Sequence, residues 1–563
     1  MSLRRTLSVL VVFGLVAAAC SGSDGDDRKR GQDRDGGPTA AAGGPVGKVV
    51  CGLPETWLQR IWRGYRADRS AELQILPRRP NFVGAGLPHV GPWDYVSHVP
   101  MFWYGPGYIK PMGPVQRHVT AADIAPTQAA LLDFDFPTPD GNVLTEALVP
   151  AEERGPPPRL VVMLIWDGAG RNVLDEWPND WPNLKSLIPE GAWYEHATVG
   201  SSPTSSAQIH GTLGTGTFPR THGLVGHSMR IDGEIVAPWK DGPGLLIRPT
   251  LADLYDVAMD NEPIVGTAGT VAIQLGMMSH GTGWEGGDRD LAILRVPGNA
   301  QTLGAEGVRW NLPDSLTPFF SYPEYANGLP PLSTYVEDLD PIDGERDGTW
   351  RGHALDAEEL LGGFYTPARI PYQTRLVEEV IEREGFGADD VPDLLYFNNK
   401  LIDQLGHIYS LNSLEIKDSL RTQDEHLPVL IDILDRLVGE GRWVMVVTAD
   451  HGSSPSPKVS GAFQISAERL HAAIQEEFDH HDDGVPVIDQ VKQTEVFMNV
   501  RELREQGSTL VDVARFVMDL RQKDVPIPGN PIPRPNRKVF QAAWPADMMR
   551  TLPCMEGIRK AQP

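Results

Sequence analysis

Three short apolar segments, each ending in polar residues, constrain the fold more than any other feature of the 563-residue chain. They are LVVMLIWDG (Leu160–Gly168), DLLYFNN (Asp393–Asn399) and RWVMVVTADHG (Arg442–Gly452). Runs that are apolar at consecutive positions, rather than at alternate ones, are typical of strands buried on both faces. Such strands occur in parallel sheets covered by helices on both sides. The sequence therefore predicts an α/β fold with a central, mostly parallel sheet.

The segment between the second and third runs, Ser410–Gly441, predicts a helix that connects two parallel strands. In sheets of this kind, ligands bind at the carboxyl ends of the strands. The polar residues that end the three runs are therefore expected to meet at one edge of the sheet. The helix is indicated by apolar residues at helical spacing, at Leu427, Leu430, Ile431, Leu434 and Leu437.

A Pro- and Gly-rich region, Gly281–Pro371, lacks clear periodicity and is expected to form an insertion near the site. The adjoining segment GMMSHGTGWEGGDRD (Gly276–Asp290) has two interpretations. It either lines a substrate pocket or forms a surface loop with incidental polar residues, and the second is the more common case.

The N-terminus has the pattern of a secretory signal. Two arginines, Arg4 and Arg5, precede the apolar run Val9–Ala19, which is too short to span a bilayer. Small residues before Cys20 resemble a bacterial lipoprotein signal, in which the cysteine carries a lipid anchor; cleavage nearby and release as a soluble exported protein is the alternative. The following Ser21–Gly47 has almost no apolar residues and is expected to be a flexible tether.

Two cysteines follow the predicted signal, Cys51 and Cys554, one near each end of the folded part. In an oxidising compartment they are expected either to form a disulfide or to stay as two unpaired buried thiols. Sequence alone does not place their Cα atoms within bridging distance.

The charge balance excludes some partners. Lys and Arg total 50 against 75 Asp and Glu, a net charge of −25. No global positive field therefore attracts nucleic acid or anionic lipid. An anionic substrate has to be held locally, for example by a metal ion.

The residues that end the three runs suit a metal site. Asp450 and His451 are adjacent after one strand, Asp403 and His407 are four apart after another, and Asp167 ends the first. Each pattern alone is also compatible with helix capping. Together they bring carboxylates and imidazoles, without thiolates, to one sheet edge, which suits Zn²⁺, with Mn²⁺ or Fe as substitutes. Two such clusters suggest a two-metal phosphotransfer site.

A further segment, SPTSSAQIHGTLGTGTFPRTHGLVGH (Ser202–His227), contains a hydroxyl four residues before HxxxxTG, and then PxxHG. With the strand-end Asp167, DxxxH and DHG, these motifs resemble the alkaline phosphatase superfamily, and within it the type I phosphodiesterase / nucleotide pyrophosphatase branch. The resemblance implies that Ser206 is the nucleophile, with Thr204 and Ser205 as neighbouring alternatives.

The resemblance also implies two ligand sets. Asp167, Asp450 and His451 would hold one ion with Ser206, and Asp403, His407 and a further histidine would hold the other. None of the three histidines after His451 has the expected setting; they are His471, His480 and His481.

The missing histidine has a candidate at the other end of the chain. Leu87–Leu148 resembles the superfamily's C-terminal segment, with LPHVGPWDY, HVP, YGPG and DIAPT in order. This implies a circular permutation in which His89 completes the second ligand set, whereas His98 of HVP is structural.

Taken together, the resemblance implies an exported phosphoester hydrolase, with two divalent ions, a phosphoserine intermediate and a small phosphoester substrate; monoester or diester preference is left open. A sulfatase is disfavoured because the segment lacks C/S-x-P-x-R. The alternative from another class is a non-catalytic surface lipoprotein that keeps the fold to bind a ligand or partner.

The expected organisation is a signal peptide, a tether and one alkaline phosphatase-like domain with loop-rich insertions. The boundaries are 1–20 for the signal, 21–47 for the tether and 48–563 for the domain. Within the domain they are 82–148 (permuted segment), 160–230 (nucleophile half), 231–372 (insertion), 373–455 (second metal-ligand half) and 456–563 (C-terminal elaboration).

Overall fold

The computed structural model describes residues 44–295, 310–355, 365–481 and 483–562. The predicted signal peptide, Cys20 and most of the predicted tether lie outside the described residues. Where the tether was expected to end at Gly47, helix α2 (Pro45–Val50) has already begun, because Pro45 suits the first turn and Val46 and Val50 are buried. Within these ranges no helix is long and apolar enough to cross a membrane.

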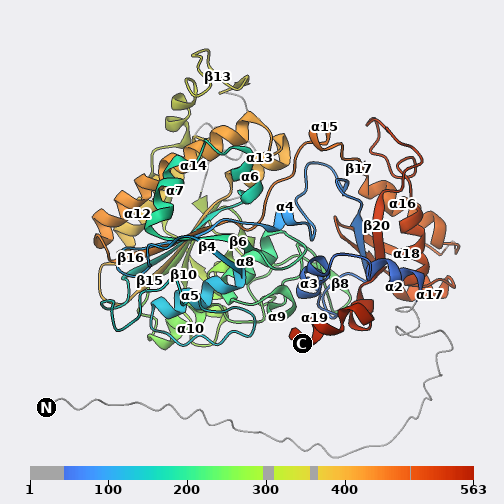
Figure 1. Cartoon of the computed structure of the whole chain (residues 1–563), viewed down its shortest axis with the longest axis horizontal. Helices are drawn as coiled ribbons and strands as arrows, with labels where there is room; N and C mark the ends of the chain where they lie inside the picture. The colour runs from blue at the N-terminus through green and yellow to red at the C-terminus, as the bar shows by residue number, and fades with distance from the viewer. Residues whose placement is uncertain (1–43, 296–309, 356–364, 482, 563) are drawn as a thin grey trace, which may run out of the picture. The chain divides into compact units, whose positions relative to one another are not determined.

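A ten-stranded sheet forms the centre of the molecule (Figure 1). The strands run in one direction except β3 and β11, which are antiparallel to their neighbours. Their spatial order is β11 (Trp310–Asn311), β10 (Asp290–Arg295), β9 (Val265–Ala268), β15 (Asp393–Asn399), β5 (Leu160–Trp166), β16 (Trp443–Thr448), β3 (Met101–Tyr104), β6 (Ala192–Thr198) and β4 (Gly113–Thr120), with β12 (Phe320–Ser321) also paired to β10.

The three apolar runs are the three central strands, so the predicted α/β class and the mostly parallel sheet are confirmed. β5 lies between β15 and β16 and is parallel to both, with Leu160 opposite Asp393 on one side and Trp443 on the other. Every residue of the three strands is buried. Their carboxyl ends therefore lie side by side.

Helices cover both faces of the sheet and enclose two hydrophobic cores. Figure 1 shows the two layers on opposite sides of the strands. One face packs against α5 (Ile124–Leu131), α8 (Ser206–Thr215) and α10 (Leu251–Ala258). The other packs against α6 (Arg171–Glu176), α7 (Pro182–Leu187), α12 (Arg369–Glu384), α13 (Leu401–Tyr409) and α14 (Leu414–Leu434). The predicted connecting helix is α14, extended by a π-turn over Asp435–Gly439.

The segment Leu87–Leu148 is built into the same sheet. It supplies β3, which pairs with β16, and β4, which pairs with β6. Helix α4 (Asp94–Ser97) precedes β3, and α5 follows β4 and packs against one face of the sheet.

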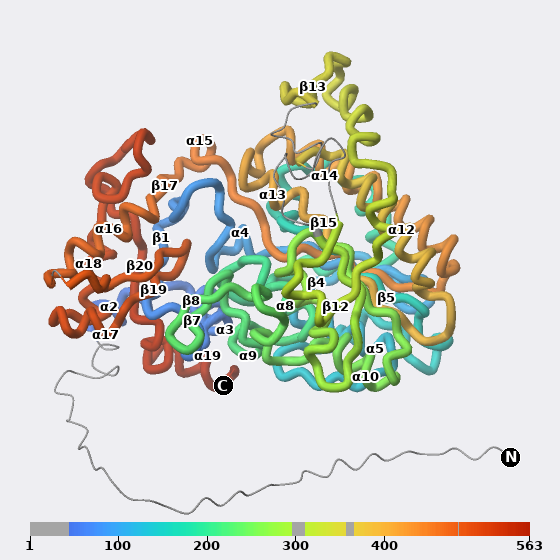
Figure 2. The backbone as a smooth tube through the Cα atoms, turned by 180° about the vertical axis from the view of Figure 1, so that it is seen from behind, coloured from blue at the N-terminus to red at the C-terminus, as the bar shows by residue number. Residues whose placement is uncertain are grey.

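Residues from both ends of the chain form a second, smaller unit, seen beside the central sheet in Figure 2. Its antiparallel sheet has the order β18 (Ile488–Val491), β19 (Glu495–Met498), β1 (Leu73–Pro77) and β20 (Phe540–Pro545). Its helices are α2, α3 (Glu55–Gly64), α16 (Ala467–Phe478), α17 (Val500–Glu505), α18 (Leu510–Asp519) and α19 (Glu556–Ala561).

The shorter elements elsewhere in the described chain are β2 (Phe82–Val83), β17 (Gln464–Ile465), β7 (Met229–Ile231), β8 (Glu234–Val236), β13 (Thr349–Trp350), β14 (His353–Ala354), α9 (Pro219–His222) and α15 (Pro457–Ser460).

A disulfide joins Cys51 and Cys554 in this unit, across 503 positions of sequence. Of the two alternatives left open by the sequence, the structure therefore has the bridge. It links the residue after α2 to the turn before α19, and both half-cystines pack against the third hydrophobic core.

We predict that the Cys51→Ala/Cys554→Ala double variant is less stable than the wild type by about 2–4 kcal/mol, because the bridge restricts the unfolded chain. Urea unfolding followed by circular dichroism measures the difference. Reduced wild-type protein is the control and should match the double variant. Equal unfolding midpoints for the variant and the oxidised wild type would contradict the prediction.

Candidate active site

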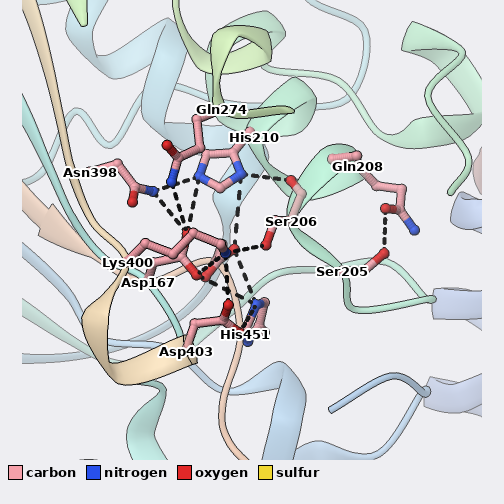
Figure 3. Close-up of polar contacts among 12 residues, drawn as sticks. Asp167, Ser205, Ser206, Gln208, His210, Gln274, Asn398, Lys400, Asp403 and His451 are labelled. Atoms are coloured by element: carbon pink, nitrogen blue, oxygen red, sulfur yellow. Dashed lines mark hydrogen bonds and ion pairs between the residues drawn. The ribbon is translucent and has the colours of Figure 1, made fainter. Parts of the chain in front are cut away.

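Polar residues from the three central strands meet at the carboxyl edge of the sheet (Figure 3). Asp167 directly follows β5, Asp403 lies in the first turn of α13 after β15, and Asp450 and His451 follow β16. Gly168 permits this approach: its φ is +77°, and a Cβ at this position would lie 2.6 Å from the Asp403 Cα. Only glycine allows the end of β5 and the first turn of α13 to come so close.

A first group consists of Asp167, Asp450 and His451, whose ligand atoms lie within 4.8 Å of one another. All three side chains are fully buried. His451 Nε2 lies 3.2 Å from Asp450 Oδ2 and 3.8 Å from Asp167 Oδ1. Neither His451 Nε2 nor Asp450 Oδ2 makes a hydrogen bond, although both are buried.

A second group consists of His89, Asp403 and His407. His89 Nε2 lies 3.1 Å from Asp403 Oδ1, and His407 Nε2 lies 3.4 Å from the same oxygen. His451 Nε2 is 3.6 Å from it, so the two groups adjoin. His89 thus lies beside its expected partners despite the separation in sequence. Of the other histidines considered, His480 and His481 are exposed in a loop after α16, and His471 lies on α16 itself.

The donor set fits divalent metal ions. Each group combines carboxylate oxygens with imidazole nitrogens, the ligand types that Zn²⁺ accepts. Asp450 Oδ2 and His451 Nε2 are buried without a hydrogen bond and face each other at 3.2 Å, an arrangement that a shared metal ion would stabilise. The outer ring nitrogens are fixed by backbone carbonyls: His89 Nδ1 lies 3.0 Å from the Thr204 oxygen, and His451 Nδ1 lies 3.1 Å from the Gly452 oxygen. Metal-binding histidines are typically oriented in this way.

Ser206 is the first residue of α8, and its side chain turns toward the two groups (Figure 3). Its neighbours use their hydroxyls elsewhere: Ser205 Oγ donates to Gln208 Oε1 at 2.6 Å, and Thr204 Oγ1 donates to the His89 carbonyl at 2.6 Å. The geometry therefore distinguishes Ser206 from both alternatives.

Lys400 is a site residue that sequence reasoning missed. Its Nζ lies 2.9 Å from Asp167 Oδ1 and 2.8 Å from Asp403 Oδ2, and it donates to Ser206 Oγ at 3.1 Å. The one available signal was a lysine directly after a buried strand and three positions before a predicted ligand. A residue there is carried to the same sheet edge as the strand's other terminal residues.

Amide and imidazole side chains on the side of the cluster away from Asp403 hold Asp167 in place (Figure 3). Asn398 Nδ2 donates to Asp167 Oδ2 at 3.0 Å and contacts His210 Nε2 at 2.9 Å. His210 Nδ1 lies 2.7 Å from the Ser206 carbonyl, and Gln274 Nε2 donates to Asp167 Oδ2 at 3.4 Å. These contacts fix the Asp167 carboxylate and the start of α8 relative to each other.

Burial and neighbouring charges shift the pKa values of several residues at this site. Burial, reinforced by His451, lowers the pKa of His89 to about 3, so this imidazole is neutral at pH 7 and free to bind a metal. Burial, together with the charge of Asp450, raises the pKa of Asp167. Burial also opposes the charge on Lys400, but Asp167, Asp403 and Asp450 outweigh it and raise the Lys400 pKa. Lys400 is therefore an ammonium ion in this arrangement.

A cavity of about 130 Å³ opens beside the cluster. It is lined by His89, Ser205, His227 and His407 and by residues 492–495, which form the turn after β18 and the first residue of β19. The Gly-rich segment 276–290 does not line this cavity. It is not a simple surface loop either, since His280 is buried, with Nδ1 2.6 Å from Asp253 Oδ2.

Comparisons with known proteins agree on one group. Residues 161–530 match the family described as Type I phosphodiesterase / nucleotide pyrophosphatase. The chain is 22% identical over 421 residues to "Alkaline phosphatase PafA" of Elizabethkingia meningoseptica, covering 66% of this chain and 74% of that protein. It is 21% identical over 337 residues to "Alkaline phosphatase PhoV" of Synechococcus elongatus, covering 53% and 60%.

Another relative is "Calcium-transporting ATPase" of Myroides odoratus, 23% identical over 351 residues, with 55% of this chain and 62% of that protein covered. The chain thus spans about three fifths of the length of PhoV and of the Myroides odoratus relative. Among solved structures, wild-type PafA is similar with a TM-score of 0.49 and 18% identity, over 69% of this chain and 85% of that one.

We predict that His89→Ala lowers the bound metal from about two ions per chain to about one, because the second group then keeps only two protein ligands. Elemental analysis of dialysed protein gives the stoichiometry. His98→Ala is the matched control, since His98 lies on the same segment and forms a bridge with Thr198 outside the cluster. Two ions per chain in His89→Ala would rule His89 out as a ligand.

Proposed function

The chain belongs to the type I phosphodiesterase / nucleotide pyrophosphatase family and is a phosphoester hydrolase, and we propose that it acts through the Ser206 hydroxyl and two divalent metal ions. The observation that carries the proposal is the convergence of Ser206 with the two His/Asp groups on one buried sheet edge. All six predicted ligand residues are found in the two groups, which disfavours a non-catalytic binding protein.

In this proposal Asp167, Asp450 and His451 would hold one ion, the one that would activate Ser206. Asp403, His407 and His89 would hold the other, which would stabilise the leaving group. Bound divalent ions would lower the pKa of the serine hydroxyl and neutralise negative charge on the leaving oxygen, and Zn²⁺ suits these ligands best.

The serine then does the chemistry. Ser206 Oγ loses its proton to solvent and attacks phosphorus, so that an Oγ–P bond forms and the ester P–O bond breaks. The leaving oxygen takes a proton from solvent, and a phosphoserine is left on the enzyme. A water molecule hydrolyses the phosphoserine, which releases phosphate from a monoester and restores the hydroxyl.

The position of Ser206 at the start of α8 supports this role. The N-terminus of a helix carries a partial positive charge and unpaired N–H groups, so it favours an alkoxide or a phosphoryl group there. His210, one turn further along α8, is bonded to the Ser206 carbonyl and to Asn398, which keeps the first turn of the helix in place.

We also propose that residues 82–148 are the permuted C-terminal segment of the family fold. This is supported by the insertion of β3 beside β16 and by the meeting of His89 with Asp403. The family match begins after this segment, at residue 161. A circular permutation of this kind is tolerated when the original chain ends lie near each other at the surface.

Export and lipid anchoring at Cys20 complete the proposal. The N-terminal pattern suggests them, and the Cys51–Cys554 disulfide is consistent with an oxidising compartment outside the cytoplasm. The cavity next to the cluster would receive a small phosphoester, and a panel of chromogenic mono- and diesters would establish which kind is preferred.

We predict that Ser206→Ala lowers kcat for phosphoester hydrolysis by about 10³-fold or more, because the nucleophile is lost. Metal content should change little, and trapping with labelled substrate should give no phosphoserine. Ser205→Ala is the matched control and should keep most of the activity, since the Ser205 hydroxyl is bonded to Gln208. Near-normal turnover in Ser206→Ala would transfer the role to Ser205 or Thr204.

A further inference from the structure

We propose that Lys400 is a catalytic residue whose ammonium group stabilises the Ser206 alkoxide, and that it weakens metal binding by sharing the carboxylates. The catalytic half rests on the proposed function. The effect on metal binding depends only on the ligand groups and can be measured without any substrate.

The first argument is position. Lys400 Nζ contacts both ligand groups and the serine. It lies 2.9 Å from Asp167 Oδ1 of the first group, 2.8 Å from Asp403 Oδ2 of the second and 3.1 Å from Ser206 Oγ. Figure 3 shows the side chain between these partners. A lysine that only neutralised buried carboxylates would not need the contact with the serine oxygen.

The second argument is the use of the Asp167 oxygens. Oδ1 accepts from Lys400, and Oδ2 accepts from Asn398 and Gln274. The first group thus has two ligand atoms without a hydrogen bond, on Asp450 and His451, whereas its third ligand is already engaged. A metal ion there must share Asp167 with Lys400 or displace it.

The third argument is burial. The Lys400 side chain is 9% exposed, and those of Asp167 and Asp403 are 0% and 5% exposed. Charges at this separation interact strongly when little water screens them. In the described part of the chain, Lys400 is the only lysine or arginine that forms an ion pair with either carboxylate. Its positive charge is therefore the main protein charge that competes with a dication.

The chemical consequence follows from the hydrogen bond to Ser206. Lysine has donors only, so the Ser206 oxygen is the acceptor and its own proton points elsewhere. When that proton leaves and Oγ attacks phosphorus, the ammonium is already placed beside the negative oxygen. Preorganised charge of this kind stabilises a transition state without rearrangement. Lys400 keeps its own proton throughout.

The test compares Lys400→Met, which keeps the length and loses the charge, with Lys400→Arg, which keeps the charge. Zn²⁺ affinity is measured on chelator-treated protein from the rise of the unfolding temperature with metal concentration, which works even for a destabilised variant. We expect Lys400→Met to bind Zn²⁺ about tenfold or more tightly than wild type, and Lys400→Arg to stay close to wild type. The rate of phosphoserine formation in one turnover should fall about 10²-fold in zinc-loaded Lys400→Met.

Tighter metal binding combined with a slower first step is a result that mere structural damage does not give, because damage lowers both. Unchanged or weaker Zn²⁺ binding in Lys400→Met overturns the metal half, and an unchanged rate of phosphoserine formation overturns the catalytic half. A wild-type protein that binds zinc but forms no phosphoserine contradicts the proposed function and the catalytic half together. The metal titration still decides the other half in that case.

Discussion

The arrangement of this protein depends on burying three carboxylates, Asp167, Asp403 and Asp450, at one edge of one sheet. Buried negative charges so close together are unfavourable unless positive charge or hydrogen-bond donors compensate them. The protein supplies part of that compensation through Lys400, Asn398 and Gln274. The unbonded ligand atoms that are left, together with the neutral imidazole of His89, account for the affinity for cations that the site is expected to have. Through Lys400 this charge also reaches Ser206, the proposed nucleophile.

Much of the fold could be predicted from the sequence because its central strands are buried on both faces. Residues 394–397 of β15, all of β5 and residues 443–447 of β16 are apolar, and polar residues begin where each strand reaches the open edge. The second unit could not be predicted in the same way. Its strands come from both ends of the chain, and in β18 (IDQV) only Ile488 is buried, so the local pattern is weak. Its pairings are fixed by contacts between segments hundreds of residues apart.

The site residues also fall into those that the local sequence predicts and those that it does not. Asp167, Asp403 and Asp450 follow directly from the strand ends, whereas His89 required a resemblance across the chain, since no local period connects it with Asp403. Lys400 was missed because a single lysine in a short connection usually faces solvent. What turns it inward is the start of α13, which places residues 400 and 403 on the same side of the first turn. That information is in the backbone path and not in the residue types.

Gly168 has a consequence beyond making room. Because a hydrogen is all that separates its backbone from the Asp403 backbone, the distance between the two ligand groups is set by main chain against main chain. Side-chain rotamers change on fast timescales, but the end of β5 and the first turn of α13 cannot move past each other without disturbing the packing of the sheet. The backbone therefore fixes the spacing between the two ligand groups, and two ions bound there would keep a nearly constant separation.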